Sequence, residues 1–251
     1  MQKSPSSSHT PGTGTGALEI WVMVPSHRPG MTGNVLANFR RQTYKNKRLL
    51  VVENGDALGV YEREWPFPEV RIIKSQATSA SGARNAGLNW LRLFHPGAFV
   101  VTMDDDDYYG PEYLSEHALH ARPWRINGKR WGWVSFDSGV VYFGNGWTPG
   151  PARGLLLGGT MGFFEHPELR FDESVLCGED SVFCREANSL GMSTNLLTAQ
   201  HYCLSREGSP DAHTHKAKDS KIWRYAGFAG IRVGGGKALC SGPPPQGPTG
   251  R

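Results

Sequence analysis

The sequence has no hydrophobic run long enough to span a membrane, and residues 1–16 lack the apolar segment of a signal peptide. It has only four cysteines, which show neither C-x-x-C spacing nor a disulfide-dense pattern. It also contains no internal repeat. These absences argue against a membrane-spanning protein, a disulfide-stapled module and a solenoid, and they predict a protein of the reducing cytoplasm.

A strong charge of either sign is absent as well, because the formal net charge is only +4 over 251 residues. This balance permits an anionic partner without requiring one. Residues 1–16 and 234–251 are rich in Ser, Gly, Pro and Thr, and we expect both to be disordered. Between them, 17–233 is long enough for one domain, which we divide into halves at 17–122 and 123–233.

Short apolar runs alternate with helical patterns four times in the first half of the chain. Strands are expected at 17–24, 48–52, 70–73 and 98–103, with a helix after each. This order predicts an α/β fold with a mainly parallel, Rossmann-like sheet, flanked by helices, and the loops after the first, second and fourth strands should converge on one edge. In the second half we expect a smaller mixed sheet that includes a hairpin of 131–136 and 140–143.

Four consecutive carboxylates, Asp104 to Asp107, directly follow the fourth apolar run, and Gly110-Pro111 then opens a helix. In an open α/β sheet the carboxyl ends of the strands are where ligands bind. Adjacent carboxylates repel one another unless a cation lies among them, and hard divalent ions prefer oxygen ligands. The pattern therefore favours a metal site over a solvated acidic turn.

Six motifs appear in an order typical of one family. They are V-P-S-H-R-P at 24–29, R-Q-T-Y at 41–44, V-V-E-N-G at 51–55, S-G-A-R-N-A-G at 81–87, M-D-D-D-D at 103–107 and G-E-D at 178–180. Together they resemble the nucleotide-sugar glycosyltransferases of the GT-A fold, especially the inverting family 2. The resemblance extends over roughly residues 20–205. The chain departs from the family pattern at Glu53, where Asp is usual, and it lacks the Q-x-x-R-W motif of processive synthases.

The resemblance implies a metal-dependent, inverting transfer of sugar from a UDP- or GDP-linked donor, with Mn²⁺ or Mg²⁺ as cofactor. Asp106 would be the direct metal ligand, with Asp104 sharing the ion or the ribose, while Asp107 serves equally well as a cap of the next turn. Arg84 would reach the diphosphate or position the sugar, unless it forms only a surface salt bridge. The implied donor contacts are Pro25, Ser26, Arg28, Glu53, Arg84, Asp104 and Asp105.

An inverting transfer needs a base on the face of the sugar opposite the leaving group. By the family pattern this is Asp180, with Glu179 as the rival, although both residues suit a helix N-terminus equally well. Among the histidines, His213 is a further candidate metal ligand, with His215 and His201 as alternatives, and each is more often structural. Two roles are open for Trp131, Trp133 and Trp147: stacking on a sugar, or packing in the core.

Two other functions remain open on the same fold: nucleotidyl transfer, and binding of a nucleotide or carbohydrate without catalysis. The first usually needs a Gly-rich basic loop after the first strand, which S-H-R-P-G at 26–30 matches poorly. The acceptor is a glycan, a small molecule or a hydroxymethylated base in DNA. The basic residues Arg122, Arg125, Lys129 and Arg130 permit the last, but a solvated loop explains them as well.

Overall fold

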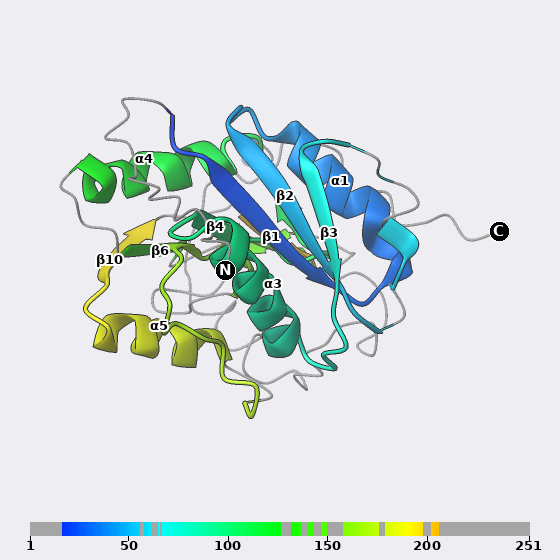
Figure 1. The fold of residues 1–251 in the computed structure, drawn as a ribbon. Coiled ribbons are helices and arrows are strands. Elements are labelled where there is room, and N and C mark those ends of the chain that lie inside the picture. The colour runs from blue at the N-terminus through cyan, green and yellow to red at the C-terminus, as the bar shows by residue number, and fades with distance from the viewer. Residues whose placement is uncertain are drawn as a thin grey trace, which may run out of the picture.

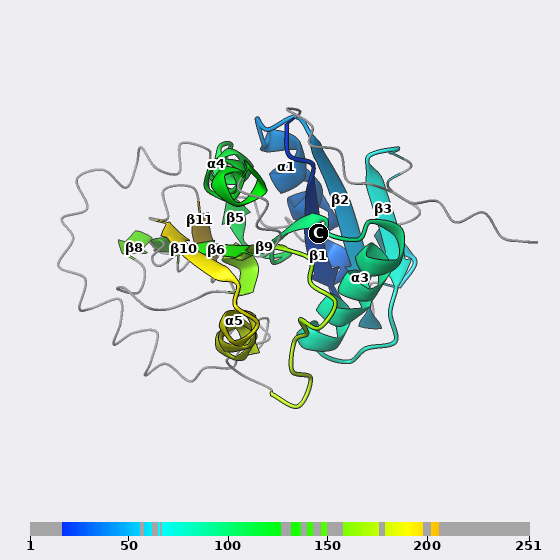
Figure 2. The same cartoon turned by 60° about the vertical axis from the view of Figure 1, so that its left-hand side comes forward.

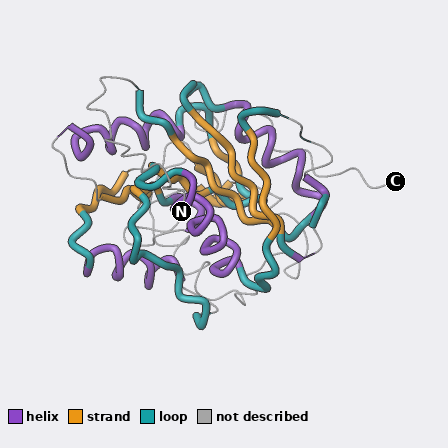
Figure 3. Tube along the Cα trace, in the orientation of Figure 1, coloured by secondary structure: helices purple, strands orange, loops and turns teal. Residues whose placement is uncertain are grey.

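The computed structural model describes residues 17–205, apart from 56–57, 62–64, 66, 127–131, 137–139, 143–146, 150–157, 176–178 and 198–201. The two predicted disordered ends, 1–16 and 234–251, lie outside these residues. Figure 1 shows the fold as a ribbon, and Figure 3 shows its strands as a layer with helices on either side.

The main sheet has seven strands in the order β10-β6-β9-β4-β1-β2-β3. Its first four strands along the chain are β1 (Ile20–Ser26), β2 (Lys47–Glu53), β3 (Val70–Lys74) and β4 (Phe99–Thr102), and all pair in parallel. β9 (Gly162–Phe164) runs antiparallel to both β4 and β6 (Gly132–Phe136), and β10 (Ser193–Leu197) completes that side in parallel with β6. The predicted mainly parallel α/β sheet is thus confirmed. Because its strands come from both sides of residue 122, the two predicted halves share one sheet.

Alternating side chains of β1 separate two cores, one on each face of the sheet. Ile20, Val22 and Val24 pack with buried residues of α1 (Thr32–Arg41) and α4 (Tyr113–Ile126). Trp21 and Met23 pack with those of α3 (Ala80–Phe94) and α5 (Glu179–Ser189). Figure 2 shows α4 and α5 on opposite sides of β6 and β10. Burial on both faces explains why these strands are continuous apolar runs rather than alternating ones.

A second sheet of four strands has the order β5-β11-β7-β8. It consists of β5 (Tyr108–Tyr109), β11 (Tyr202–Ser205), β7 (Val140–Tyr142) and β8 (Trp147–Pro149). β11 pairs in parallel with β7 and antiparallel with β5, so the sheet is mixed, as predicted. The predicted hairpin is wrong: β6 belongs to the main sheet and β7 to this one. Strands β5, β7 and β11 pair across long stretches of sequence, which short-range patterns do not reveal.

Candidate active site

The predicted convergence of loops is confirmed at the carboxyl edge of the main sheet. β1 and β2 end side by side, with Ser26 opposite Glu53, and Met23 pairs with Thr102 at the end of β4. The four aspartates leave the sheet directly after β4, whose residues are all buried. Two short 3-10 turns complete this edge, η1 (Pro29–Met31) after β1 and η3 (Gly158–Thr160) before β9.

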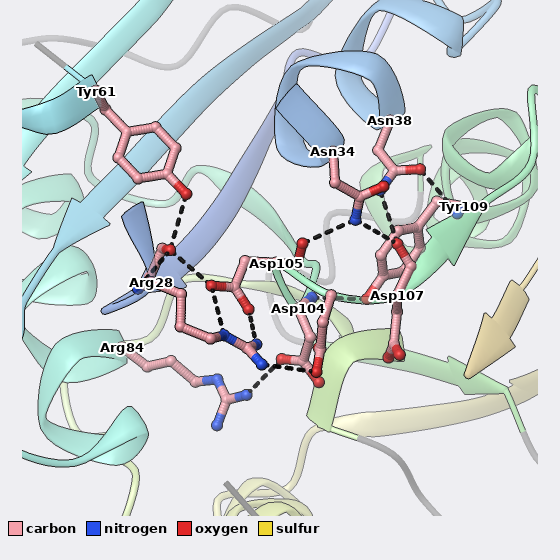
Figure 4. A network of polar contacts seen from close by, with 11 residues as sticks. Arg28, Asn34, Asn38, Tyr61, Arg84, Asp104, Asp105, Asp107 and Tyr109 are labelled. Carbon is pink, nitrogen blue, oxygen red and sulfur yellow. Dashed lines mark hydrogen bonds and ion pairs between the residues drawn. The ribbon is translucent and has the colours of Figure 1, made fainter. Parts of the chain in front are cut away.

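Asp105 is a buried carboxylate that is held by two residues at the end of β1 and just beyond it. Its Oδ2 accepts hydrogen bonds from Ser26 Oγ at 2.6 Å and from Arg28 Nε at 3.2 Å, and its Oδ1 accepts one from Arg28 Nη2. Burial raises the pKa of Asp105, while Arg28 and Ser26 act in the opposite direction. Arg28 also donates from Nη1 to Asp106 Oδ2 at 3.0 Å (Figure 4), so one guanidinium joins two neighbouring carboxylates.

Arg84 joins the donor side of the predicted site to the acceptor side. Its Nη2 donates to Asp104 Oδ1 at 2.8 Å, and its Nη1 donates to Glu179 Oε1 at 3.2 Å. Only 4 % of this side chain is exposed, and its Nε has no hydrogen-bond partner among the residues that the structure describes. The surface salt bridge considered for Arg84 is therefore excluded, because the guanidinium lies inside the site.

The S-G-A-R-N-A-G motif fixes the helix that carries Arg84. Ser79 caps α3 by accepting a hydrogen bond from Gly82 N. A Cβ on Gly87 would lie 2.6 Å from Met23 Sδ, so the glycine lets α3 pack closely on β1. Asn85 donates to Phe171 O and accepts from Phe171 N, both across 86 residues of sequence. The motif thus positions the arginine by packing and hydrogen bonds.

Two asparagines of α1, which sequence reasoning missed, hold the aspartate loop. Asn34 Nδ2 donates to the carbonyls of Asp105 and Asp107, and Asn38 Nδ2 donates to that of Asp107. The two residues are four positions apart, so they lie on the same side of the helix. The sequence signal that could have revealed them is a pair of polar residues four positions apart on the buried side of a predicted helix.

Glu53 is completely buried, and its two carboxylate oxygens accept hydrogen bonds from the backbone N–H groups of Gly59 and Tyr61, each at 2.6 Å. The Tyr61 hydroxyl in turn donates to Ser26 Oγ at 2.8 Å, and burial raises the pKa of this phenol. Glu53 therefore secures the segment after β2, and because it is completely buried, contact with a nucleotide base would require a rearrangement around it.

The acidic pair lies at the N-terminus of α5, as predicted. Phe183 and Ala187 on the same helix are buried, and Leu190 just beyond it packs against the same core, so one side of the helix faces the core. Glu179 is held by Arg84, whereas Asp180 accepts a hydrogen bond from Ser181 N at 2.7 Å. Burial raises the pKa of Asp180, and the charges of Glu179 and Asp104 raise it further, against the effect of Arg84.

A sequence profile described as Glycosyl transferase family 2 matches residues 22–123, from β1 through most of α4. That segment carries five of the six motifs and places Ser26, Arg28, Arg84 and the aspartates as described above. Over these residues, which are less than half of the chain, the sequence is similar to glycosyltransferase family 2. No individual curated protein matches the sequence significantly.

Similar solved structures show that the chain has the GT-A fold. Residues 1–349 of TarS from S. aureus, in complex with UDP-GlcNAc, align with a TM-score of 0.55 at 16 % identity. The alignment covers 76 % of this chain and 60 % of that chain. The mannosyltransferase PcManGT from Pyrobaculum calidifontis, in complex with GDP-Man and Mn²⁺, gives 0.54 at 15 % identity, over 75 % of this chain and 57 % of that one.

A third similar structure is 4-diphosphocytidyl-2C-methyl-D-erythritol synthase, with a TM-score of 0.50 and 17 % identity. The alignment covers 72 % of this chain and 89 % of that chain. The present chain spans about three fifths of the two transferase chains above.

The carboxylates of the candidate site fit a divalent cation by their chemistry and charge. Four carboxylates (Asp104, Asp105, Asp106 and Glu179) contact two guanidinium groups, so this network has two more negative than positive charges. The side chains of Asp104 and Asp106 keep 32 % and 14 % of their surface exposed. In the part of the chain that the structure describes, no three His, Cys, Asp or Glu side chains converge as a ready metal cage.

Several predicted site residues lie outside what the structure describes. These are His201, His213, His215, Trp131, Lys129 and Arg130, together with the side chains of Arg122, Arg125, Trp133 and Trp147. Among the described helices, none is both long and apolar enough to cross a membrane. The cytoplasmic location stays a prediction.

Proposed function

We propose that this chain is a metal-dependent, inverting glycosyltransferase that moves a sugar from a UDP- or GDP-linked donor to an acceptor hydroxyl. One observation carries the proposal. Arg84 contacts both Asp104, at the exit of β4, and Glu179, at the start of α5. Carboxylates suited to the leaving group and carboxylates suited to the acceptor therefore belong to one site.

Asp106 and Asp104 are the residues that would hold the cation, because they are the more exposed carboxylates of the aspartate cluster that the structure describes. When bound, a divalent ion neutralises the charge that develops on a leaving diphosphate. Mn²⁺ and Mg²⁺ both suit carboxylate oxygens, and magnesium sites often use one or two carboxylates together with substrate phosphates. The presence of Mn²⁺ in the PcManGT complex supports the same choice.

Asp180 is the proposed general base. A base must accept the proton of the acceptor hydroxyl, and a pKa raised by burial makes the carboxylate a stronger base than an exposed one. Glu179 is already engaged in an ion pair with the buried guanidinium of Arg84. These contacts favour Asp180, whereas the sequence left the choice between the two open.

The donor would lie along the carboxyl edge, over Pro25, Ser26, Arg28, Glu53 and the aspartates. Ser26 and Asp105 already bond each other, and Glu53 bonds backbone amides. Because Glu53 and Asp105 are also buried, direct contact with the nucleoside requires a rearrangement around them. The complexes of TarS with UDP-GlcNAc and of PcManGT with GDP-Man support a nucleotide-sugar donor of either type.

A screen for donor hydrolysis tests the proposal without knowledge of the acceptor. Purified protein is incubated with a panel of UDP- and GDP-sugars, with and without Mn²⁺ or Mg²⁺, and release of the nucleoside diphosphate is measured. We expect one sugar class to be hydrolysed in a metal-dependent way, and Asp106→Ala to abolish both hydrolysis and the metal dependence of nucleotide binding. Circular dichroism of the variant controls for loss of fold. Metal-dependent binding that persists in Asp106→Ala would contradict the assignment of that ligand.

Nucleotidyl transfer is the second candidate, and the observation that favours it is the structural similarity to 4-diphosphocytidyl-2C-methyl-D-erythritol synthase. It predicts release of pyrophosphate when nucleoside triphosphates are added to the screen, and no hydrolysis of any sugar donor. Binding of nucleotides with no turnover of either kind would indicate a non-catalytic module.

A DNA acceptor is tested separately. Neutralising Arg125, Lys129 and Arg130 together should weaken DNA binding and flatten its dependence on salt. Absence of any DNA binding at low salt would leave a glycan or a small molecule as the acceptor class.

A further inference from the structure

Arg28 lies between the first strand and the aspartate loop, with its charge directed into the candidate metal site (Figure 4). Its backbone N–H faces Ser26 Oγ at 3.5 Å, and the next residue begins the turn η1. Its side chain is 18 % exposed. The arginine is thus anchored at its backbone, while its guanidinium fills space beside the two middle aspartates.

The contacts of Arg28 with its two carboxylates are unequal. Two nitrogens of Arg28, Nε and Nη2, donate hydrogen bonds to Asp105, whose side chain is only 4 % exposed. This fork is therefore a buried, two-point ion pair. Asp106 accepts a hydrogen bond of 3.0 Å from Nη1 of Arg28 and is 14 % exposed. A ligand arriving from solvent reaches the Asp106 contact more readily than the Asp105 fork.

We propose that Arg28 is a built-in counter-cation of Asp106, which a divalent ion must displace when it binds there. This inference rests on the proposed function, since it takes Asp106 as the metal ligand. Once displaced, Nη1 of Arg28 lies beside the ion and is free to donate to an oxygen of the donor diphosphate. The fork with Asp105 keeps the guanidinium in place during the exchange.

The exchange links metal binding to donor binding. Without a nucleotide, the ion competes with Arg28 for Asp106 and binds weakly. With a nucleoside diphosphate present, Arg28 gains a new acceptor in the phosphate, and the competition is relieved. Ion and nucleotide should therefore strengthen each other's binding by the same factor. A purely structural Arg28, which only neutralises buried Asp105, predicts no such competition at Asp106.

Manganese binding to the nucleotide-free protein tests this directly. Free Mn²⁺ is measured by electron paramagnetic resonance during titration of the wild type and of Arg28→Gln. We expect the variant to bind Mn²⁺ roughly tenfold or more tightly, the order set by removal of one charged hydrogen bond. Arg48→Gln is the matched control: it removes the same charge from an exposed pair with Glu19 and should leave the affinity unchanged. Unchanged or weaker binding in Arg28→Gln would overturn the proposal.

Two further variants keep the test decisive. Adding Asp106→Asn to Arg28→Gln should remove the gain, because the exchange takes place at Asp106; a retained gain would contradict the proposal. If Arg28→Gln does not fold, Arg28→Lys serves instead, since a single ammonium cannot bridge both carboxylates as the fork does. Arg28→Lys should bind Mn²⁺ more tightly than the wild type, by a smaller factor than Arg28→Gln does. An affinity equal to that of the wild type would count against the exchange.

The same titration with UDP or GDP present measures the linkage. The nucleotide should tighten Mn²⁺ binding by a larger factor in the wild type than in Arg28→Gln, and equal factors would contradict the exchange. These readouts need no transfer activity. If no sugar donor is hydrolysed while Arg28→Gln gains affinity, the proposed function fails and the inference stands. Metal-dependent hydrolysis together with an unchanged Mn²⁺ affinity in Arg28→Gln gives the reverse result: the proposed function stands and the inference fails.

Discussion

Arg84 on α3 donates a hydrogen bond of 3.2 Å to Glu179 on α5, although 95 residues separate them in the sequence. The same guanidinium donates to Asp104, so it neutralises one carboxylate from each side of the candidate site. Without it, two partly buried carboxylates would face each other with no cation between them.

Arg84→Met should therefore destabilise the protein by about 3–5 kcal/mol, the range typical of a broken buried ion pair. The measurement is the free energy of unfolding in urea. Arg48→Met removes an arginine from an exposed pair with Glu19 and should change stability by only about 0–1 kcal/mol. Equal effects of the two substitutions would show that Arg84 contributes no more than a surface ion pair.

Gly159 in the turn η3 lies against the aspartate loop. A Cβ at this position would lie 2.6 Å from the Tyr109 hydroxyl and 2.8 Å from Asp104 Oδ2. Because that hydroxyl accepts a hydrogen bond from Asp104 N, Gly159→Ala should displace both the backbone and the side chain of Asp104. We expect weaker metal-dependent binding of UDP or GDP, measured by calorimetry.

Gly33→Ala is the control for this substitution. Gly33 lies inside α1 with nothing within 4 Å of an added Cβ, and alanine there should raise stability by roughly 0.5–1 kcal/mol. Unaltered nucleotide binding by Gly159→Ala would mean that the loop accommodates the methyl group without moving Asp104.

The sequence was sufficient to predict the carboxyl edge of the sheet because buried parallel strands and the aspartate run are local signals. Contiguous runs such as 49–52 and 99–102 define strands, and polar residues directly after them lie at the edge. A Cβ added at Gly159 would clash with Asp104 and Tyr109, and one added at Gly162 would clash with His117, so other groups approach the backbone closely at both glycines.

Pairing between distant segments could not be predicted in the same way. Arg84 with Glu179, Asn34 with the aspartate loop, and Tyr61 with Ser26 are all contacts across more than 30 residues. The hairpin prediction was wrong for this reason: β6 and β7 are adjacent in sequence but belong to different sheets. The individual side chains that determine the geometry of the site can be identified only once the fold has brought them together.

The pH dependence of donor hydrolysis should report on Asp180. A general base acts when deprotonated, so activity should rise as the pH increases through its pKa. Because burial and the neighbouring carboxylates raise that pKa above 3.8, the acidic limb of kcat/KM should lie above the ordinary range of aspartate. Glu179→Gln removes one of the charges that raise it and should move the limb to lower pH. A limb that moves to higher pH, or stays in place, would contradict this assignment.

Asp180→Asn separates catalysis from helix capping. Asparagine keeps the size and most of the hydrogen bonding of Asp180, but it cannot accept a proton. Loss of a general base typically lowers the rate about a hundred- to ten-thousand-fold. Transfer, or hydrolysis in the absence of an acceptor, should fall by that order, while the affinity for donor and metal stays near that of the wild type. A capping residue predicts another result, because asparagine caps a helix about as well as aspartate and activity would survive. Near-normal turnover by Asp180→Asn would therefore rule out Asp180 as the base, and Glu179→Gln in the same assay would then show whether the carboxylate held by Arg84 takes the proton instead.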